Sequence, residues 1–247
     1  MQKTGKRIAM IGHKLIPSRN GGVEVVVTHL GPHLVELGYT VTCYNRTNSE
    51  CREARKMGRL ENTYRGVRLI WTPTINRRGL AAMSSSILAS VMAAFGTYDL
   101  VHYHTEGPCV LCWLPRLMGK KVVVTVHGLD HQRQKWGKLV SAYIMQGEKA
   151  AVCHAHRIIV LSKGVQTYFL DRYRRQTDLI PNGIDPAKPK AASEIKKSLV
   201  CCQGNISCFS DVWCRKKVFI PSLRLTSPSK RIKNWSLPAA HWIPMNM

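Results

Sequence analysis

Three short clusters of glycine, histidine and carboxylate residues contain the groups in this chain that could do chemistry. They are Gly12–Glu24, His102–Glu106 and His127–Asp130, and each begins at or near the end of an apolar run. A histidine can act as a general base or bond a sugar hydroxyl, and backbone N–H groups at a helix start can bind a phosphate. We therefore predict a polar small-molecule site. Its candidate residues are Asn20, Gly21, Gly22, Glu24, His104, Glu106, His127, Gly128 and Asp130.

The glycine pair Gly21-Gly22 directly precedes an expected helix over Val23–Leu37. Backbone N–H groups at such a start can face a phosphate or a sugar hydroxyl. The spacing is not G-x-G-x-x-G, so a nicotinamide cofactor is not indicated. A tight loop that uses glycine for positive φ is the alternative.

Two further positions are candidates for ligand contact. His127 follows the β-branched run Lys121–Val126, where a structural histidine and a ligand-contacting histidine both fit. Ser162 and Lys163 stand at an expected helix start, where an N-cap role for Ser162 is favoured over ligand contact. Its hydroxyl would then accept a hydrogen bond from the first turn.

Apolar strand-like runs alternate with helix-like segments from residue 5 to residue 185. The expected strands are Lys6–Ile11, Thr40–Tyr44, Val67–Trp71, Leu100–His104, Lys121–Val126, Arg157–Leu161 and Asp178–Ile180. The expected helices are Val23–Leu37, Leu80–Phe95, Pro108–Met118, Lys138–Ala155 and Lys163–Tyr173, and 46–62 is expected to be a loop with a helical piece. Continuous apolar strands favour an α/β fold, a parallel sheet with helices on both faces. The three clusters would then meet at the carboxyl edge of the sheet.

Composition sets the class of partner. The formal charge is +23, of which residues 186–247 carry +9, from eleven lysines and arginines against two acids, so +14 remains on residues 1–185. Such a charge favours nucleic acid, phosphorylated lipid or an acidic membrane surface. Aromatic residues make up only 7% and no DNA-binding motif is present, so a basic nucleic-acid-binding protein is the less favoured alternative.

Membrane, export and metal signals are weak. No uninterrupted apolar stretch reaches the length of a membrane span, and the N-terminus lacks a signal-peptide pattern, so we expect a cytoplasmic protein with reduced thiols. Cys109 and Cys112 have C-x-x-C spacing without a second pair at zinc-finger distance, so no metal site is predicted.

The chain changes character near Lys197. Residues 198–247 hold four of the nine cysteines, three of the six tryptophans and one acid, Asp211, and no helix or strand period is sustained. The segment fits translation out of frame. When the last base of each codon is read with the first two of the next, Asn234-Trp235 and His241-Trp242 must each give Leu.

A continuous shifted translation is allowed from about Asn205 to Met247, and it contains G-R-L-V-P-E-K-G. It would supply a buried strand, a basic glycine turn, an amphipathic helix and a second strand ending in glycines. A disordered basic extension is the alternative.

Five segments in chain order carry a family resemblance. They are Arg7–Lys14 (RIAMIGHK), Pro17–Glu24 (PSRNGGVE), Val122–Asp130 (VVVTVHGLD), Ile159–Lys163 (IVLSK) and Ile180–Asp185 (IPNGID). Together they resemble the bacterial GT-B glycosyltransferases of family 4, and within them the rhamnosyltransferase-like members. Leu15 stands where relatives usually have glycine, and Asn20 where they often have an aromatic residue.

The resemblance implies a domain plan. Residues 1–185 would be the Rossmann-like acceptor-side half of a GT-B fold, with Pro181, Asn182 and Gly183 as the hinge. Residues 186–197 would start the interdomain linker. Residues 198–247 would be an irregular tail that replaces the nucleotide-sugar-binding domain.

The resemblance also implies an activity. The full enzyme would transfer a sugar, with retention, from a nucleotide diphosphate-sugar to a lipid-linked or polysaccharide acceptor at the inner face of the plasma membrane. No metal or other cofactor is implied, since Arg and Lys neutralise the leaving diphosphate. His127 matches the cleft histidine that contacts the transferred sugar, and Gly21-Gly22 matches the loop facing the donor. In the family these Arg and Lys residues form a clamp in the second domain, and because that domain is missing, the present chain is expected to be inactive. A regulatory fragment that pairs with an intact transferase is a third alternative.

Overall fold

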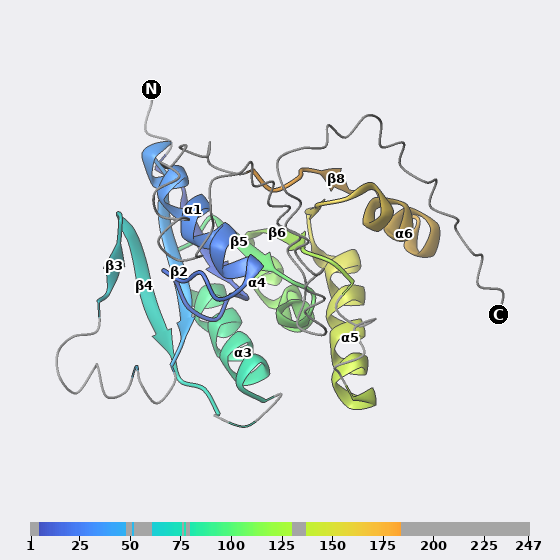
Figure 1. The fold of residues 1–247 in the computed structure, drawn as a ribbon, viewed down its shortest axis with the longest axis horizontal. Coiled ribbons are helices and arrows are strands. Elements are labelled where there is room, and N and C mark those ends of the chain that lie inside the picture. The colour runs from blue at the N-terminus through green and yellow to red at the C-terminus, as the bar shows by residue number, and fades with distance from the viewer. Residues whose placement is uncertain are drawn as a thin grey trace, which may run out of the picture. The chain divides into compact units, whose positions relative to one another are not determined.

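Parallel strand pairing organises the part of the chain that carries the three polar clusters (Figure 1). The computed structural model describes residues 5–47, 51, 61–75, 77, 80–129 and 137–183. The chain divides into two units after Ile184, and all described residues belong to the first unit. The predictions for Asp130, for most of 46–62 and for residues 186–247 lie outside the described residues.

An eight-stranded sheet runs through this unit in the order β3-β4-β2-β1-β5-β6-β7-β8. Neighbouring strands are parallel throughout, apart from the antiparallel pair β3–β4. The strands are β1 Arg7–Ile11, β2 Thr40–Arg46, β3 Thr63–Tyr64, β4 Val67–Thr72, β5 Leu100–His104, β6 Lys121–Val126, β7 Arg157–Val160 and β8 Asp178–Leu179.

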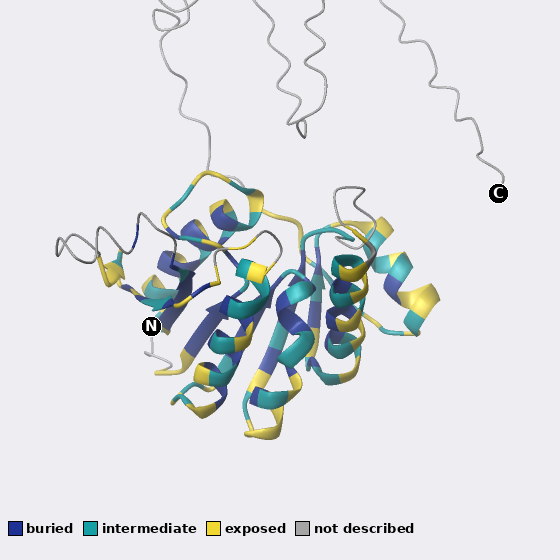
Figure 2. Ribbon diagram, turned by 90° about the horizontal axis from the view of Figure 1, so that it is seen from below, coloured by how far each residue is buried: buried dark blue, intermediate teal, exposed yellow. Residues whose placement is uncertain are grey.

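Helices cover both faces of the sheet. They are α1 Gly22–Glu36, α3 Leu80–Phe95, η1 Gly107–Leu111 (a 3-10 helix), α4 Trp113–Leu117, α5 Lys138–His154 and α6 Lys163–Tyr173. Successive strand side chains point to opposite faces, so Ile8 and Met10 of β1 join one core with Val27 of α1. Ala9 and Ile11 join the other core, which includes residues of α3, α5 and α6. Figure 2 shows the buried sheet between helices whose outer sides are exposed.

The predicted α/β architecture, a Rossmann-like parallel sheet with helices on both faces, is confirmed. Two local predictions differ from the structure. The single helix expected over Pro108–Met118 is split into η1 and α4 at Cys112. The restart places Pro115 in the first turn of α4, where its missing N–H leaves no helical bond unmade. The two-residue strand β3 was not predicted. Its hairpin turns at Arg65-Gly66, two residues with positive φ, and this pair is not one of the usual Asn-Gly or Asp-Gly turn signals.

The strand order creates a switch point beside β1. β1 pairs with β2 on one side and with β5 on the other. The chain therefore runs toward one side of the sheet after the carboxyl end of β1 and toward the other side after the carboxyl end of β5. Ligands of open parallel sheets bind in the crevice at such a point. The loops after β1 and β5 are therefore the expected walls of a site.

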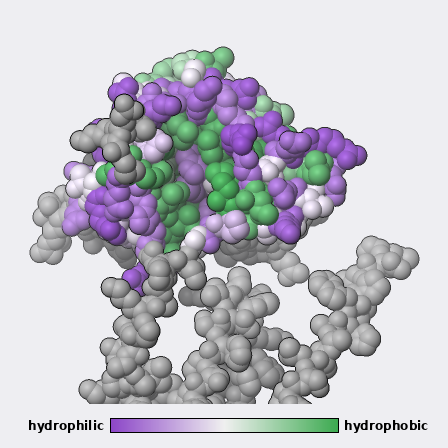
Figure 3. Space-filling model, turned by 90° about the horizontal axis from the view of Figure 1, so that it is seen from above, coloured by the Kyte–Doolittle hydropathy of each residue, from purple (hydrophilic) through white to green (hydrophobic). Residues whose placement is uncertain are grey.

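The outer surface is not uniformly polar. Figure 3 shows a band of apolar side chains across the middle of one face, bordered by hydrophilic residues. None of the helices that the structure describes is long and apolar enough to cross a bilayer.

Candidate functional site

The loop after β1 lies directly against the end of β5. Gly12 has φ +118, and a Cβ at this position would lie 2.0 Å from the carbonyl oxygen of His104. Only glycine fits this approach, on both conformational and steric grounds. The first two polar clusters are thus brought together at the switch point.

Glu24 anchors the same loop from the first turn of α1. Its side chain is buried, and Oε1 accepts a hydrogen bond of 3.0 Å from the backbone N–H of Lys14. A Cβ on Gly21 would lie 2.0 Å from the other carboxylate oxygen. A carboxylate in the first helical turn is also favoured by the helix dipole. Gly21 therefore leaves the space that the Glu24 carboxylate occupies, and a larger residue there would displace that side chain.

The alternative explanation of the glycine pair, positive φ, does not hold. Gly21 is extended at φ −175, and Gly22 is the first residue of α1 with no atom near the position of a Cβ. No side chain caps this helix start. The N–H groups at its N-terminus can therefore bind an anion or a sugar hydroxyl.

Histidines of β5 meet the histidine that follows β6 at the rim. His104 Nδ1 and His127 Nε2 are 3.4 Å apart, and the ring of His102 stacks on that of His104 with centroids 4.2 Å apart. His102 Nε2 is 2.8 Å from Thr125 Oγ1. His104 is fully buried and His127 is half-buried, so His127 is the member of the pair that a ligand can reach.

Two residues at the end of β2, the buried Asn45 and the half-buried Arg46, complete the site, and neither was predicted from the sequence. Asn45 bonds both backbone groups of Ile16 and lies 3.0 Å from Nε2 of His13. Arg46 donates to the carbonyl of Gly12 at 3.4 Å. The signal was present, because Asn45 and Arg46 are polar residues at the carboxyl end of an apolar strand.

The imidazoles of the site are held in the neutral state. Burial lowers the pKa of His13 and of His102 to about 4 in each case. Burial, followed by the neighbouring imidazoles, holds the pKa of His104 well below its usual value. Burial also lowers the pKa of His127, against the opposing charge of Glu24. At neutral pH these rings therefore act as hydrogen-bonding groups and not as cations.

Glu106, which was predicted to contact a ligand, lies beneath the surface of the site. It is fully buried, and α5 approaches it so closely that a Cβ on Gly147 would lie 2.1 Å from the Glu106 carbonyl oxygen. The preceding Thr105 has φ +76, an uncommon backbone conformation for a β-branched residue. His104 and Glu106 therefore support the rim from beneath.

The remaining predicted residues lie as follows. Gly128 follows His127 with φ +147, and Asn20 lies exposed in the loop before α1. Ser162 caps α6 by accepting a 3.4 Å hydrogen bond from the N–H of Val165, and Lys163 is the exposed first residue of that helix. The cap role favoured for Ser162 is thus confirmed.

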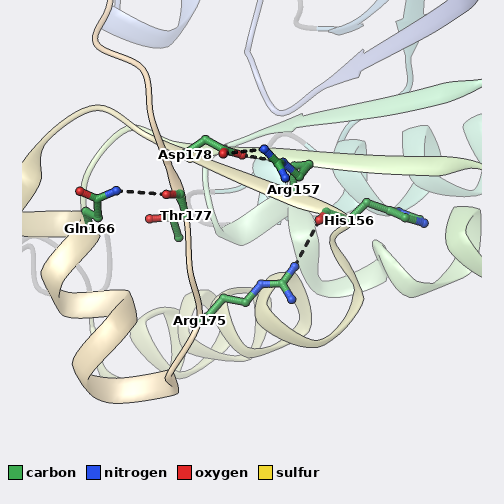
Figure 4. A network of polar contacts seen from close by, with 6 residues as sticks. All are labelled: His156, Arg157, Gln166, Arg175, Thr177 and Asp178. Atoms are coloured by element: carbon green, nitrogen blue, oxygen red, sulfur yellow. Dashed lines mark hydrogen bonds and ion pairs between the residues drawn. The ribbon is translucent and has the colours of Figure 1, made fainter.

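The hinge candidates Pro181, Asn182 and Gly183 are exposed at the end of the described chain. Figure 4 shows the contacts that fix the strand before them. Arg157 of β7 donates two hydrogen bonds, of 2.9 and 2.8 Å, to the carboxylate of Asp178, which begins β8. These contacts set where the chain leaves the sheet.

The geometry suits a polar, anionic or hydroxyl-rich ligand. A helix N-terminus, a glycine loop, one carboxylate and one reachable neutral imidazole converge at the switch point. Among residues 5–47, 61–75, 80–129 and 137–183, no group of three or more His, Cys, Asp or Glu residues could hold a metal ion. Cys109 and Cys112 are buried thiols, and burial raises the pKa of Cys112 to about 12.

Two solved structures are similar to this fold. Anabaena HepE, determined in complex with UDP and glucose, matches with a TM-score of 0.52 and 15% identity, over 78% of this chain and 50% of HepE. The N-terminal domain of Candida albicans trehalose-6-phosphate phosphatase matches with a TM-score of 0.47 and 13% identity, over 75% of this chain and 50% of that one. The chain therefore spans about half the length of these structures. No curated protein matches it.

A family model gives the assignment. The model of Glycosyltransferase Family 4 matches residues 20–188, which is more than half of the chain. The match begins at Asn20 and includes the glycine pair, Glu24, the histidines of β5 and His127 after β6. The resemblance is thereby confirmed at the level of the family: this chain belongs to Glycosyltransferase Family 4.

Proposed function

We propose that residues 1–185 are the acceptor-side domain of a retaining GT-B sugar transferase. The observation that carries this proposal is the convergence of Glu24, the start of α1 and His127 at the β1/β5 switch point of a family 4 chain. Nothing in the described geometry favours the nucleic-acid alternative over this one.

Each group at the rim has a role in this proposal. The start of α1 at Gly21-Gly22 faces the phosphates and sugar of the donor, because its N–H groups are uncapped. His127 bonds a hydroxyl of the transferred sugar, since it is neutral and half-buried. Arg and Lys of the second domain would neutralise the leaving diphosphate, so the transfer needs no metal.

The substrates are a nucleotide diphosphate-sugar and a lipid-linked or polysaccharide acceptor. HepE was solved with UDP and glucose, which supports UDP-glucose as the first donor to test. The rhamnosyltransferase-like motifs support a nucleotide diphosphate-rhamnose as the second. Release of the nucleotide diphosphate in the presence of a membrane extract tests both donors. If a protein whose frame has been restored releases no nucleotide diphosphate from the first donor and none from the second, this proposal is contradicted.

The segment 198–247 affects the activity that we expect of this chain. The codons of residues 205–247 can be read in the shifted frame as a segment containing G-R-L-V-P-E-K-G. This segment resembles the family's Arg/Lys clamp, which neutralises the leaving diphosphate. We therefore propose that one base restores the second domain and that the 247-residue chain transfers little sugar. Resequencing the coding DNA from about codon 190 past the stop tests the frame. A second frame closed by stop codons would contradict this.

A peripheral contact with the inner face of the plasma membrane is part of the proposal. Phe95 at the end of α3 is 71% exposed and Leu117 of α4 is 69% exposed. Lys120 Nζ donates to the Gly96 carbonyl at 2.6 Å, which holds these two helix ends together. Exposed apolar side chains beside cations such as Arg116 favour an anionic lipid surface.

Cosedimentation with phosphatidylglycerol vesicles tests the membrane contact. The variant with Phe95→Ser and Leu117→Ser should bind several-fold less in high salt, where charge attraction is screened. Leu139→Ser is the matched control, because Leu139 is 88% exposed on α5. Equal binding of both variants and the parent chain would contradict this contact site.

A further inference from the structure

Arg46 places a cation beside the loop that follows β1. Its backbone N–H donates to the carbonyl of Lys14 at 2.7 Å, and its guanidinium Nη2 donates to the carbonyl of Gly12 at 3.4 Å. Arg46 is also paired in register with Thr72 of β4, so the strand end that carries it is held on both sides. The guanidinium therefore lies against Gly12, which is itself only partly buried, at the switch point of the sheet.

The guanidinium of Arg46 has more donors than the surrounding protein uses. It carries five N–H donors in a planar fork, and the 3.4 Å contact with Gly12 is its one hydrogen bond within the described part of the chain. It forms an ion pair with none of the carboxylates that the structure describes. Burial lowers the pKa of Arg46, against the opposing charge of Glu24. This half-buried cation has therefore lost hydration without gaining a carboxylate partner.

The carboxylate of the site is bonded to the backbone and not to this arginine. Glu24 Oε1 accepts from the N–H of Lys14 at 3.0 Å, while the N–H of Arg46 donates to the carbonyl of Lys14. Lys14 is thus held by the first turn of α1 on one side and by the end of β2 on the other. Two groups that bind phosphate oxygens, the uncapped start of α1 and the guanidinium fork of Arg46, are brought to the same loop.

The same loop connects Arg46 to the imidazole that a ligand can reach. Gly12, whose carbonyl the guanidinium contacts, lies against the carbonyl of His104. The ring nitrogen of His104 is in turn 3.4 Å from that of His127. Two intervening residues therefore link the cation to the half-buried imidazole, so one ligand at this rim has both a cation and a neutral hydrogen-bonding ring close by.

We propose that Arg46 binds a phosphate group of a substrate and makes the rim selective for phosphorylated ligands. This inference rests on the proposed function, in which the nucleotide diphosphate-sugar and a lipid-linked acceptor both carry phosphate. Two phosphate oxygens accept parallel N–H bonds from the guanidinium fork, and their charge supplies the partner that the described carboxylates do not. The first domain would then contribute a cation of its own, besides the Arg and Lys expected in the second domain.

Titration calorimetry of the 247-residue chain with inorganic pyrophosphate tests the site, at about 0.15 M salt so that exposed charges are screened. Arg46→Gln removes the fork. Arg68→Gln is the matched control, because Arg68 is an exposed arginine of β4 and its substitution removes the same charge. We expect Arg46→Gln to weaken pyrophosphate binding about 10-fold and Arg68→Gln less than about 2-fold. Equal weakening in the two variants, or no saturable binding by the parent chain, would overturn the proposal.

Two further ligands identify the source of the phosphate. UDP represents the donor, and farnesyl phosphate represents a lipid-linked acceptor. Weaker binding of UDP by Arg46→Gln assigns Arg46 to the donor, and weaker binding of farnesyl phosphate assigns it to the acceptor. Uridine and farnesol, which lack the phosphate, should bind equally to the variant and to the parent chain. A folded Arg46→Gln protein with the parent affinity for pyrophosphate, UDP and farnesyl phosphate would contradict the proposal.

A measurement on the parent chain decides the case in which Arg46→Gln does not fold. In 1H–15N spectra the Nε–H resonance of Arg46 should shift when pyrophosphate is added, and that of Arg68 should not. An unchanged Arg46 resonance would refute the contact. None of these measurements needs transferase activity. If the frame-restored protein releases no nucleotide diphosphate while Arg46 still binds pyrophosphate, the proposed function alone fails.

Discussion

The close approach of Gly21 to Glu24 gives the sharpest stability prediction. Gly21 is extended, so alanine is allowed there by the backbone, and the only severe conflict is with the carboxylate oxygen 2.0 Å from the new Cβ. We predict that Gly21→Ala expels the Glu24 side chain. The backbone N–H of Lys14 then loses the acceptor that it has at 3.0 Å.

The magnitude can be built from two parts. A hydrogen bond to a charged group contributes roughly 1.5–3 kcal/mol, so we assign about 2 kcal/mol to the lost Lys14 bond. Alanine at an N-cap is about 1 kcal/mol worse than glycine. Gly21→Ala should therefore lower the free energy of unfolding by about 3 kcal/mol in the parent chain. In a Glu24→Ala background only the cap part, about 1 kcal/mol, should remain.

Urea unfolding of the four proteins in this cycle measures the coupling. At an m-value of about 2 kcal/mol/M, a loss of 3 kcal/mol moves the midpoint by about 1.5 M. Gly22→Ala is the control, since no atom lies within 4 Å of its Cβ position, and stability should stay equal or rise by up to about 1 kcal/mol. An equal cost of Gly21→Ala with and without Glu24 would refute the steric argument.

Three further predictions concern the same unit. Gly12→Ala should cost about 3 kcal/mol or prevent folding, because its Cβ would strike backbone at positive φ, while Gly119→Ala, with positive φ but open space, should cost about 1 kcal/mol. Urea midpoints compare them, and equal losses would contradict the close approach. Because the pKa of His13 and of His102 is about 4 in the folded state and near 6.5 in the unfolded chain, stability should be full above pH 6.5 and fall by about 3 kcal/mol per ring toward pH 4. Urea midpoints that do not change between pH 7 and pH 5 would contradict this. Ser162→Ala should cost about 1 kcal/mol through loss of the cap, and no loss would favour a ligand role.

The fold was predictable because its signals are local. Continuous apolar runs such as Lys121–Val126 define strands, and alternation with helical segments requires parallel crossovers. The parallel arrangement in turn brings polar strand ends to one edge. For this reason the proximity of Gly12 to His104, and of His104 to His127, could be expected from the sequence.

The rest depends on contacts between distant side chains, which no spacing rule reports. Gly21 is needed because of the rotamer of Glu24, and not because of its own φ. The contact of His13 with the buried amide of Asn45, which is distant in sequence, could not be predicted from spacing. Likewise, the depth of Glu106 depends on the close packing of α5 at Gly147.

We propose that the β1/β5 rim holds the sugar of a nucleotide diphosphate donor. The most direct test is nucleotide diphosphate release from UDP-glucose and from a nucleotide diphosphate-rhamnose, measured on the frame-restored protein and its folded His127→Ala variant. We expect release by the restored protein and a loss of about 100-fold in the variant, the scale of one transition-state hydrogen-bonding group. Full activity in the His127→Ala protein would show that His127 does not contact the transferred sugar.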